Sequence, residues 1–306
     1  MNILIISSNL IGDNILSTGI IKYFVDQNPD SKLTIVVGPS AAQVYKNFPN
    51  IKKIIIVNKR KFELHWFQIW INCFFSKWDI IIDLRSSAIS YFLFNKKKYI
   101  FKHTNNTNKI HQFTNFFKLK KIAYPIIFSS KQEDKIAENL LIKDNKYIVV
   151  APGGNWDPKI WPIESFNKLF KILFNIKNNI IIILIGSKKE KEKIKKLTLG
   201  IDHKKIIDLM GESITQTHSF IKKSNLFIGN DSGLMHLAAA SKIPTIGLFG
   251  PTNDKIYAPF GEKCYVLRTK ETYEDFTNIK IEINKSYMHS IKSEDIIKMI
   301  KAKKLI

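Results

Sequence analysis

Residues 226–259 read LFIGNDSGLMHLAAASKIPTIGLFGPTNDKIYAP, and this stretch decides the fold. A short apolar run ends in the turn Gly229-Asn230-Asp231-Ser232-Gly233, and a small-residue helical stretch follows. A second apolar run, 244–249, ends in another glycine-containing turn. This order predicts strand, loop, helix, strand and loop. Because the first N–H groups of a helix and the positive end of its dipole point the same way, the first turn suits a phosphate.

Two residues of that turn carry the predicted phosphate contact. Gly233 lets the backbone approach a ligand closely. Ser232 either caps the helix or binds a phosphate oxygen, and the sequence leaves both roles open. The alternative for the whole segment is an ordinary strand–helix turn in which Asp231 and Ser232 are capping residues only.

The same alternation of apolar runs and amphipathic stretches occupies both halves of the chain. Strands are predicted at 3–7, 33–37, 53–57, 80–84, 147–151, 179–185, 205–209, 226–229 and 245–249. Helices are predicted at 12–26, 41–47, 62–75, 163–175, 188–196, 214–223 and 234–240. Apolar strands that alternate with helices predict an α/β fold with parallel sheets. We expect two Rossmann-like domains facing a central cleft, 1–140 and 141–306, joined near 129–145.

Length and composition agree with two globular domains. The chain has 306 residues, of which 45% are hydrophobic, and this fits a soluble protein. Longer apolar runs of about 20 residues, as a membrane span needs, are missing. The run 3–6 is too short for a signal core and lacks a basic start. With two distant cysteines, Cys73 and Cys264, we expect a reduced, cytoplasmic protein and a monomer.

The net charge of +22 comes almost entirely from lysine, because Arg60, Arg85 and Arg268 are the only arginines. Abundant Ile and Asn indicate coding bias, so part of this charge is compositional. The rest would attract nucleotides, phosphorylated lipids or a membrane leaflet. Nucleic acid is not an expected partner, because zinc-finger and basic-zipper spacings are missing and arginine is scarce.

The segment 226–259 resembles the signature of glycosyltransferase family 9, the ADP-heptose:lipopolysaccharide heptosyltransferases. The matching positions are Gly229, Asp231, Ser232, Gly233, His236, Leu237, Ala238, Ala239, Ala240, Pro244, Phe249, Gly250, Pro251 and Thr252. The resemblance implies a GT-B fold, with an N-terminal acceptor domain and a C-terminal nucleotide-sugar domain. It also implies that the final helix, about 293–306, packs back on the N-terminal domain.

The activity implied by the resemblance is an inverting, metal-independent transfer without a cofactor. A heptose, or a related sugar, would move from an ADP-sugar to the lipopolysaccharide inner core. The acceptor would be lipid A–core at the inner membrane surface, with the protein peripheral on its inner face.

The first predicted strand leads into residues 7–15, SSNLIGDNI. This stretch lacks G-x-G-x-x-G, so a nicotinamide cofactor is not expected. It resembles the opening of the family, which makes Asp13 the catalytic base toward the acceptor hydroxyl, with Gly12 and Asn14 on the acceptor side. The alternative is that Asp13 merely caps the helix. Ser7 and Asn14 depart from the family pattern, where Arg or Lys and an apolar residue are usual.

Residues 151–162, APGGNWDPKIWP, resemble the family segment Pro-Gly-x…Lys-x-Trp-Pro. The resemblance places Lys159 on the donor diphosphate, where it would neutralise the departing charge. Gly154 and Asn155 would line the same pocket. A lysine in such a lysine-rich chain is ordinarily solvated, and only its position between the glycine turn and Trp161 gives it this role.

Further residues complete the donor site that the resemblance implies. Glu190 matches the carboxylate expected on the ribose hydroxyls, with Glu192 as a competitor. Met210 is expected beside the adenine, and Asp231 on sugar hydroxyls. His236 either hydrogen-bonds the diphosphate or packs in the core. Neither Asp-x-Asp nor a ligand-spaced cluster of His, Asp and Glu occurs, so a metal is not expected.

Residues 60–78, RKFELHWFQIWINCFFSKW, form an aromatic stretch between basic residues. Phe62, Trp66, Phe67, Ile69, Trp70, Phe74 and Phe75 give it a broad apolar face. A membrane-interface helix has this composition, but a place between two strands favours packing on the first sheet, with part of the face exposed. The lysine clusters 96–98 and 118–121 either hold anionic groups of the acceptor or are solvated, which is the default.

Three alternatives to the main interpretation remain. The chain is a member of the same family with a different donor or glycan acceptor, a nucleotide-sugar epimerase, or a non-catalytic membrane-associated binding protein. An epimerase would convert the donor without an acceptor, and a binding protein would take no nucleotide sugar. The sequence does not identify the sugar or the acceptor position.

Overall fold

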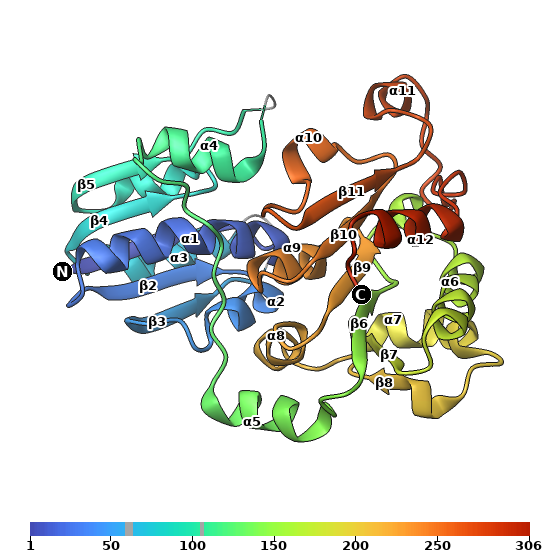
Figure 1. The fold of residues 1–306 in the computed structure, drawn as a ribbon. Helices are drawn as coiled ribbons and strands as arrows, with labels where there is room; N and C mark the ends of the chain where they lie inside the picture. The colour runs from blue at the N-terminus through green and yellow to red at the C-terminus, as the bar shows by residue number, and fades with distance from the viewer. Residues whose placement is uncertain (59–63, 105–106) are drawn as a thin grey trace. The chain divides into compact units, whose positions relative to one another are not determined.

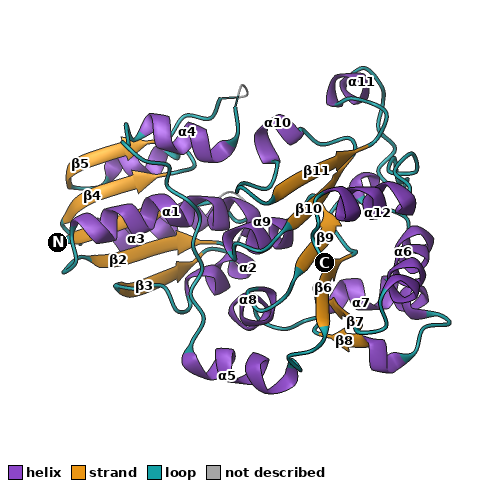
Figure 2. Cartoon of the chain, in the orientation of Figure 1, coloured by secondary structure: helices purple, strands orange, loops and turns teal. Residues whose placement is uncertain are grey.

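The computed structural model describes residues 1–58, 64–104 and 107–306. The chain divides into two compact units, Met1–Phe128 and Ser129–Ile306. Each unit is built on one parallel β-sheet with helices around it (Figures 1 and 2). The predicted α/β class with two parallel sheets is therefore confirmed.

The sheet of the first unit consists, within the described residues, of β1 (Asn2–Ile6), β2 (Lys32–Val37), β3 (Ile51–Ile56), β4 (Trp78–Asp83) and β5 (Asn95–Ile100). Its strand order is β3-β2-β1-β4-β5. The helices are α1 (Ile11–Gln27), α2 (Pro39–Ala42), α3 (Leu64–Phe74) and α4 (Lys109–Phe116). Leu4 and Ile81 of the central strands pack with Ile69 and Cys73 of α3, so α3 covers one face of the sheet.

The sheet of the second unit consists, in the same described part, of β6 (Lys146–Ala151), β7 (Ile180–Leu184), β8 (Ile206–Asp208), β9 (Leu226–Asn230), β10 (Thr245–Phe249) and β11 (Cys264–Arg268). Its order is β11-β10-β9-β6-β7-β8. The helices are α5 (Lys131–Leu140), α6 (Ile163–Ile176), α7 (Lys188–Lys193), α8 (Ile214–Ile221), α9 (Gly233–Ala240), α10 (Asp254–Tyr257), α11 (Tyr273–Thr277) and α12 (Ser293–Ala302). β6 and β9 lie at its centre, so the loops after them meet at one edge.

The second unit starts earlier than the predicted boundary at residue 140, because α5 packs on α8. Glu133 accepts a hydrogen bond from the Thr215 hydroxyl at 2.6 Å. Asp134 accepts one from the Ser219 hydroxyl at 2.9 Å and pairs with Lys222 at 2.6 Å. The segment expected to be a linker is therefore an anchored helix of the second unit.

The final helix belongs to the second unit. Ile296, Ile297 and Ile300 of α12 are buried in the core of that unit, and the helix packs against α6. Its apolar face, spaced as one helical stripe, is therefore used within this unit. The expected packing on the N-terminal domain remains a prediction.

Some element boundaries differ from the sequence-based prediction. The stretch 41–47 divides into the short α2 and a 3₁₀ turn, η1 (Gln43–Tyr45). Of the predicted helix 62–75, Phe62 lies outside the described residues, as does Arg60. None of the helices described is long and apolar enough to cross a membrane.

Candidate active site

The turn between β9 and α9 is open to a ligand. Ser232 is the N-cap residue of α9, yet its side chain makes no capping hydrogen bond. Its Oγ is buried and has no hydrogen-bond partner in the described structure. An unsatisfied buried hydroxyl costs free energy, and a ligand oxygen at the helix N-terminus would relieve that cost. Of the two roles predicted for Ser232, side-chain capping is therefore not observed.

Asn230, which the sequence analysis did not select, fixes this turn to the glycine loop after β6. Its Nδ2 donates to the carbonyl oxygens of Pro152 at 2.9 Å and Gly153 at 3.1 Å. Its Oδ1 accepts from the Trp161 backbone N–H at 3.0 Å. The side chain is fully buried. Its three hydrogen bonds therefore hold the β9–α9 turn and the loop after β6 together.

Lys159 and Asp231 meet beside this turn. Lys159 ends a 3₁₀ turn, η4 (Asp157–Lys159), and its Nζ lies 3.6 Å from Asp231 Oδ2. Their side chains are only 14% and 9% exposed. The structure therefore brings Lys159, Asp231, Ser232 and Gly233 together, a cation beside a helix N-terminus, which is a suitable environment for a diphosphate.

The turn after β10 is held by Arg268, a second residue that the sequence analysis did not select. The guanidinium donates to the carbonyl oxygens of Gly250 at 2.5 Å and Thr252 at 2.6 Å, and to Asp254 at 2.9 Å. Thr252 Oγ1 is buried and, like Ser232 Oγ, lacks a hydrogen-bond partner in the part described. Two unsatisfied hydroxyls thus follow neighbouring strands.

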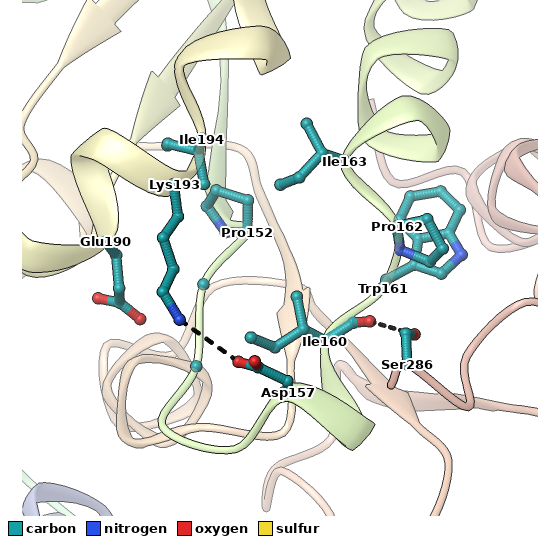
Figure 3. Close-up of a pocket in the computed structure, with 12 residues that line it drawn as sticks. Pro152, Asp157, Ile160, Trp161, Pro162, Ile163, Glu190, Lys193, Ile194 and Ser286 are labelled. Carbon is teal, nitrogen blue, oxygen red and sulfur yellow. Dashed lines mark hydrogen bonds and ion pairs between the residues drawn. The ribbon is translucent and has the colours of Figure 1, made fainter. Parts of the chain in front are cut away.

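A cavity of about 240 Å³ lies beside the glycine loop (Figure 3). Its walls are mostly apolar and include Ile160, Ile163 and Ile194. Lys193 of α7 reaches across its mouth to Asp157, with 3.5 Å between Nζ and Oδ1. An apolar slot with a few charged groups at its rim is a common form of small-molecule site.

Glu190 lines this cavity and also caps α7. Its Oε2 accepts from the Ser187 backbone N–H at 2.6 Å. A Cβ added at Gly153 would lie 2.3 Å from Glu190 Oε1, so the Glu190 carboxylate lies directly against the Gly153 backbone. Glu192, the competing residue, is exposed and does not line the cavity. The structure thus favours Glu190.

Gly154 lines the cavity with Glu190, but the other predicted donor residues do not. Asn155 is exposed and does not line it, because the loop turns its side chain toward solvent. Met210 belongs to the apolar core of the second unit. His236 is buried within α9. A direct ligand contact for these three remains a prediction.

The first unit holds a separate cavity of about 180 Å³ at the ends of β1 and β4. Asp13 lines it from the first turn of α1. The N-cap of that helix is Leu10, without a side-chain cap bond, so Asp13 is not the capping residue. Ser7, which replaces the family's basic residue, lines this cavity too. Gly12 lies in the same half-buried turn.

Basic side chains face Asp13 in this cavity. Arg85, His103 and Lys109 contribute to its lining, and Lys109 Nζ contacts His103 Nδ1. Burial lowers the pKa of Lys109, and the Asp13 carboxylate opposes that shift. Burial, and then Lys109, lower the pKa of His103, and Asp13 again opposes. Asp13 therefore sits within electrostatic reach of both groups, which the sequence analysis did not select.

Asn14, predicted on the acceptor side, belongs to the turn that holds Asp13 but does not line its cavity. The residue is 0% exposed, and its Nδ2 donates to the carbonyl oxygens of Ser8 at 2.8 Å and Leu10 at 2.7 Å. Its Oδ1 accepts from the Tyr45 hydroxyl at 3.0 Å. Burial raises the pKa of Tyr45 to about 12, so this phenol stays a donor. Asn14 therefore holds the loop that presents Asp13.

Among the described residues, no group of three or more His, Cys, Asp and Glu side chains is placed to hold a metal ion.

Each unit has a parallel β-sheet flanked by helices, with polar loops at the carboxyl ends of its strands, where folds of this class commonly bind ligands. The model of glycosyltransferase family 9 (heptosyltransferase) matches residues 86–285. The chain therefore belongs to glycosyltransferase family 9, as the sequence resemblance indicated, and it is a glycosyltransferase.

Individual relatives agree with this assignment. The chain is 25% identical over 311 residues to lipooligosaccharide heptosyltransferase 2 of Haemophilus ducreyi, with 88% of each chain covered. Its fold is similar to a family 9 glycosyltransferase from Veillonella parvula, with a TM-score of 0.79, 21% identity and 98% and 96% coverage. It is also similar to Escherichia coli ADP-heptose lps heptosyltransferase II, with a TM-score of 0.75, 17% identity and 99% and 98% coverage. The predicted GT-B fold is confirmed.

Proposed function

We propose that this chain transfers a heptose from ADP-heptose to the inner core of a lipopolysaccharide, with inversion at the sugar carbon. Membership of the heptosyltransferase family supports the class of reaction. The observation that carries the site is the group formed by Lys159, Asp231 and the unsatisfied Ser232 hydroxyl at the N-terminus of α9.

The donor belongs to the second unit in this proposal. The diphosphate lies at the start of α9, where Lys159, the Ser232 hydroxyl and the helix dipole stabilise the charge that develops on the departing ADP. The apolar cavity beside the glycine loop accepts the nucleoside, and Glu190 lines it to accept hydrogen bonds from the ribose hydroxyls. Asp231, which pairs with Lys159, accepts hydrogen bonds from the hydroxyls of the transferred sugar.

The acceptor belongs to the first unit. Asp13 removes the proton from the attacking hydroxyl, which then displaces ADP in one in-line step. Arg85 and Lys109 line the same cavity and supply positive charge for an anionic core sugar. Because the leaving charge is met by Lys159 and backbone N–H groups, the reaction needs neither a metal nor a cofactor.

Location and assembly are part of the proposal. The enzyme acts as a monomer at the cytoplasmic face of the inner membrane, where a lipid A–core acceptor is presented. The net charge of +22 supports attraction to an anionic leaflet.

Calorimetric titration without divalent metal tests the donor. We expect ADP-heptose to bind more tightly than ADP-glucose or a UDP-sugar. Preference for another nucleotide sugar would overturn the heptose assignment and keep the family. Absence of binding to all three would favour the non-catalytic alternative.

A further inference from the structure

One face of the first unit exposes an unusual number of large apolar side chains. Phe67 and Ile71 of α3, and Phe75 directly after that helix, follow one another at four-residue spacing, and all three are exposed. The neighbouring segment that begins with η3 (Ala88–Phe92) exposes Tyr91, Phe92 and Phe94. These six side chains, which we call the aromatic patch, are between 45% and 87% exposed.

The patch is one continuous surface. The Trp70 indole N–H donates to the Phe92 carbonyl oxygen at 3.3 Å. The ring centroids of Phe74 and Phe94 lie 5.5 Å apart, and those of Phe74 and Phe75 lie 5.3 Å apart. α3 is therefore joined to the segment after β4 by aromatic contacts, and their exposed rings belong to one face.

Packing within the unit does not explain these side chains. Ile69 and Cys73 point into the core, at 2% and 0% exposure, and they already attach α3 to the sheet. The outer positions gain nothing from that attachment. Contiguous exposed apolar surface of this kind is rare in soluble proteins and marks an interaction site.

The charge around the patch identifies the partner. Lys98, on the face of the sheet that α3 covers, has its Nζ 4.4 Å from the centroid of the Tyr91 ring. Lys77, two residues after Phe75, is exposed. Residues 64–78 and 88–98 contain neither Asp nor Glu, although Asp79 pairs with Lys96 at 2.7 Å. Aromatic rings bordered by lysines match the headgroup region of an anionic bilayer, where rings enter and lysines meet lipid phosphates.

A second copy of the chain fits this surface less well. In a two-fold symmetric dimer the same patch meets itself, so the lysines of one copy would face those of the other. Like charges placed together in this way are unfavourable. An anionic membrane has no such conflict.

Helix α3, which carries part of the patch, also contacts a residue of the proposed acceptor cavity. The Arg85 guanidinium lies 5.1 Å from the centroid of the Trp66 ring on α3, and Arg85 lines the cavity that holds Asp13. A surface docked through α3 would therefore place lipid headgroups close to this cavity, where an acceptor anchored in that lipid is presented.

We propose that the aromatic patch docks this enzyme on an anionic phospholipid membrane beside its acceptor cavity. The inference names the protein surface that binds the membrane, and it rests on the membrane location proposed above. The experiment separates the two claims, because vesicle binding and sugar transfer are measured independently.

The test is co-sedimentation of the full chain with vesicles of phosphatidylcholine, with or without phosphatidylglycerol. The patch variant is F67S/F75S/F92S. The matched control is I142S/L199S/I283S, which changes three similarly exposed apolar residues of the second unit. Transfer to a lipid-free core oligosaccharide is measured for all proteins, and circular dichroism reports their folding.

We expect the wild type and the control to sediment with phosphatidylglycerol vesicles, and the patch variant to bind at least about tenfold more weakly. Transfer to the lipid-free acceptor stays unchanged. Salt weakens binding, since lysines contribute. Equal sedimentation of wild type and patch variant would overturn the proposal, as would a wild type that binds neither vesicle. If the triple variant does not fold, F75S at the most exposed position gives the same comparison.

Failure of transfer in every protein, with vesicle binding intact, would instead contradict the proposed function and leave the docking surface standing.

Discussion

At the scale of single residues, Asp13 has the most specific role. Its carboxylate lines a cavity at the end of β1 and is not used for capping. We expect Asp13→Ala to lower kcat by about 10²- to 10⁴-fold, because a general base contributes that much. The affinity for ADP-heptose, measured by calorimetry, should stay nearly unchanged. Loss of donor binding in this variant would contradict the role.

Lys159 is predicted to act on both catalysis and stability. Lys159→Met should lower kcat roughly 10²- to 10³-fold, as removal of a charge-stabilising group does. It should also lower the free energy of unfolding by about 2 kcal/mol, because Asp231 stays buried without its partner. The double variant with Asp231→Asn should regain stability, measured by urea unfolding, but not activity.

Lys168→Met is the matched control for Lys159. Lys168 also pairs with a carboxylate, that of Glu294 at 2.6 Å, but its side chain is 61% exposed and lines neither cavity. Such exposed pairs contribute little to stability, so both activity and unfolding should change slightly. Equal effects of the two substitutions would show that Lys159 acts only as surface charge.

Asn14 is a structural residue, and its substitution gives a different signature from that of Asp13. Asn14→Leu removes the hydrogen bonds of Asn14 to the Tyr45 hydroxyl and to the Ser8 carbonyl oxygen. We expect a loss of about 2–3 kcal/mol in the free energy of unfolding. Chemical denaturation measures it, with Tyr45→Phe as the smaller change. An unchanged free energy of unfolding together with a raised KM for the acceptor would contradict this structural role. It would support the contact between Asn14 and the acceptor that the sequence predicted.

At the scale of elements, the attachment of α5 to α8 makes a pH prediction. Burial would raise the pKa of Asp134, but hydrogen bonds from Lys222, Ser129 and Ser219 lower it to about 2. Because this pKa lies below the ordinary value of 3.8, the ionised side chain stabilises the folded state above about pH 4. That stabilisation is lost as the pH falls toward 2.

Asp134→Asn tests this linkage. The difference in unfolding free energy between wild type and variant should be largest at neutral pH and should shrink below about pH 4. Urea denaturation at a series of pH values measures it. A difference that is independent of pH would show that the carboxylate charge is not what attaches α5.

The sequence predicted the central strands well, because they are apolar runs buried on both faces, as in β1 and β9. Of the four edge strands that the structure describes, it predicted β3 and β8 but missed β5 and β11. β5 has the sequence NKKKYI. From the sequence alone, its lysines are interpreted as a solvated cluster and not as part of a strand. Lysine on an edge strand prevents pairing with another chain. Such a strand is recognised only from its pairing with a neighbouring strand in the structure.

The same limit applies to the site. Residues in the glycine-containing motifs, such as Ser232 and Lys159, could be predicted from the local sequence. Asn230 and Arg268 act through bonds to carbonyl oxygens of distant loops, and His103 and Lys109 meet Asp13 only through the fold. No spacing in the sequence encodes these contacts, so they required the structure.

At the scale of the whole molecule, the family match spans the end of the first unit and most of the second. The central claim is that the two units together transfer a heptose without a metal. The most direct measurement is incubation of the purified protein with ADP-heptose and a heptose-deficient core oligosaccharide in EDTA, followed by mass spectrometry. We predict an acceptor heavier by one heptosyl residue, with one ADP released for each transfer. An unchanged acceptor from ADP-heptose, beside a product from a different nucleotide sugar or only after a divalent metal is added, would contradict the account.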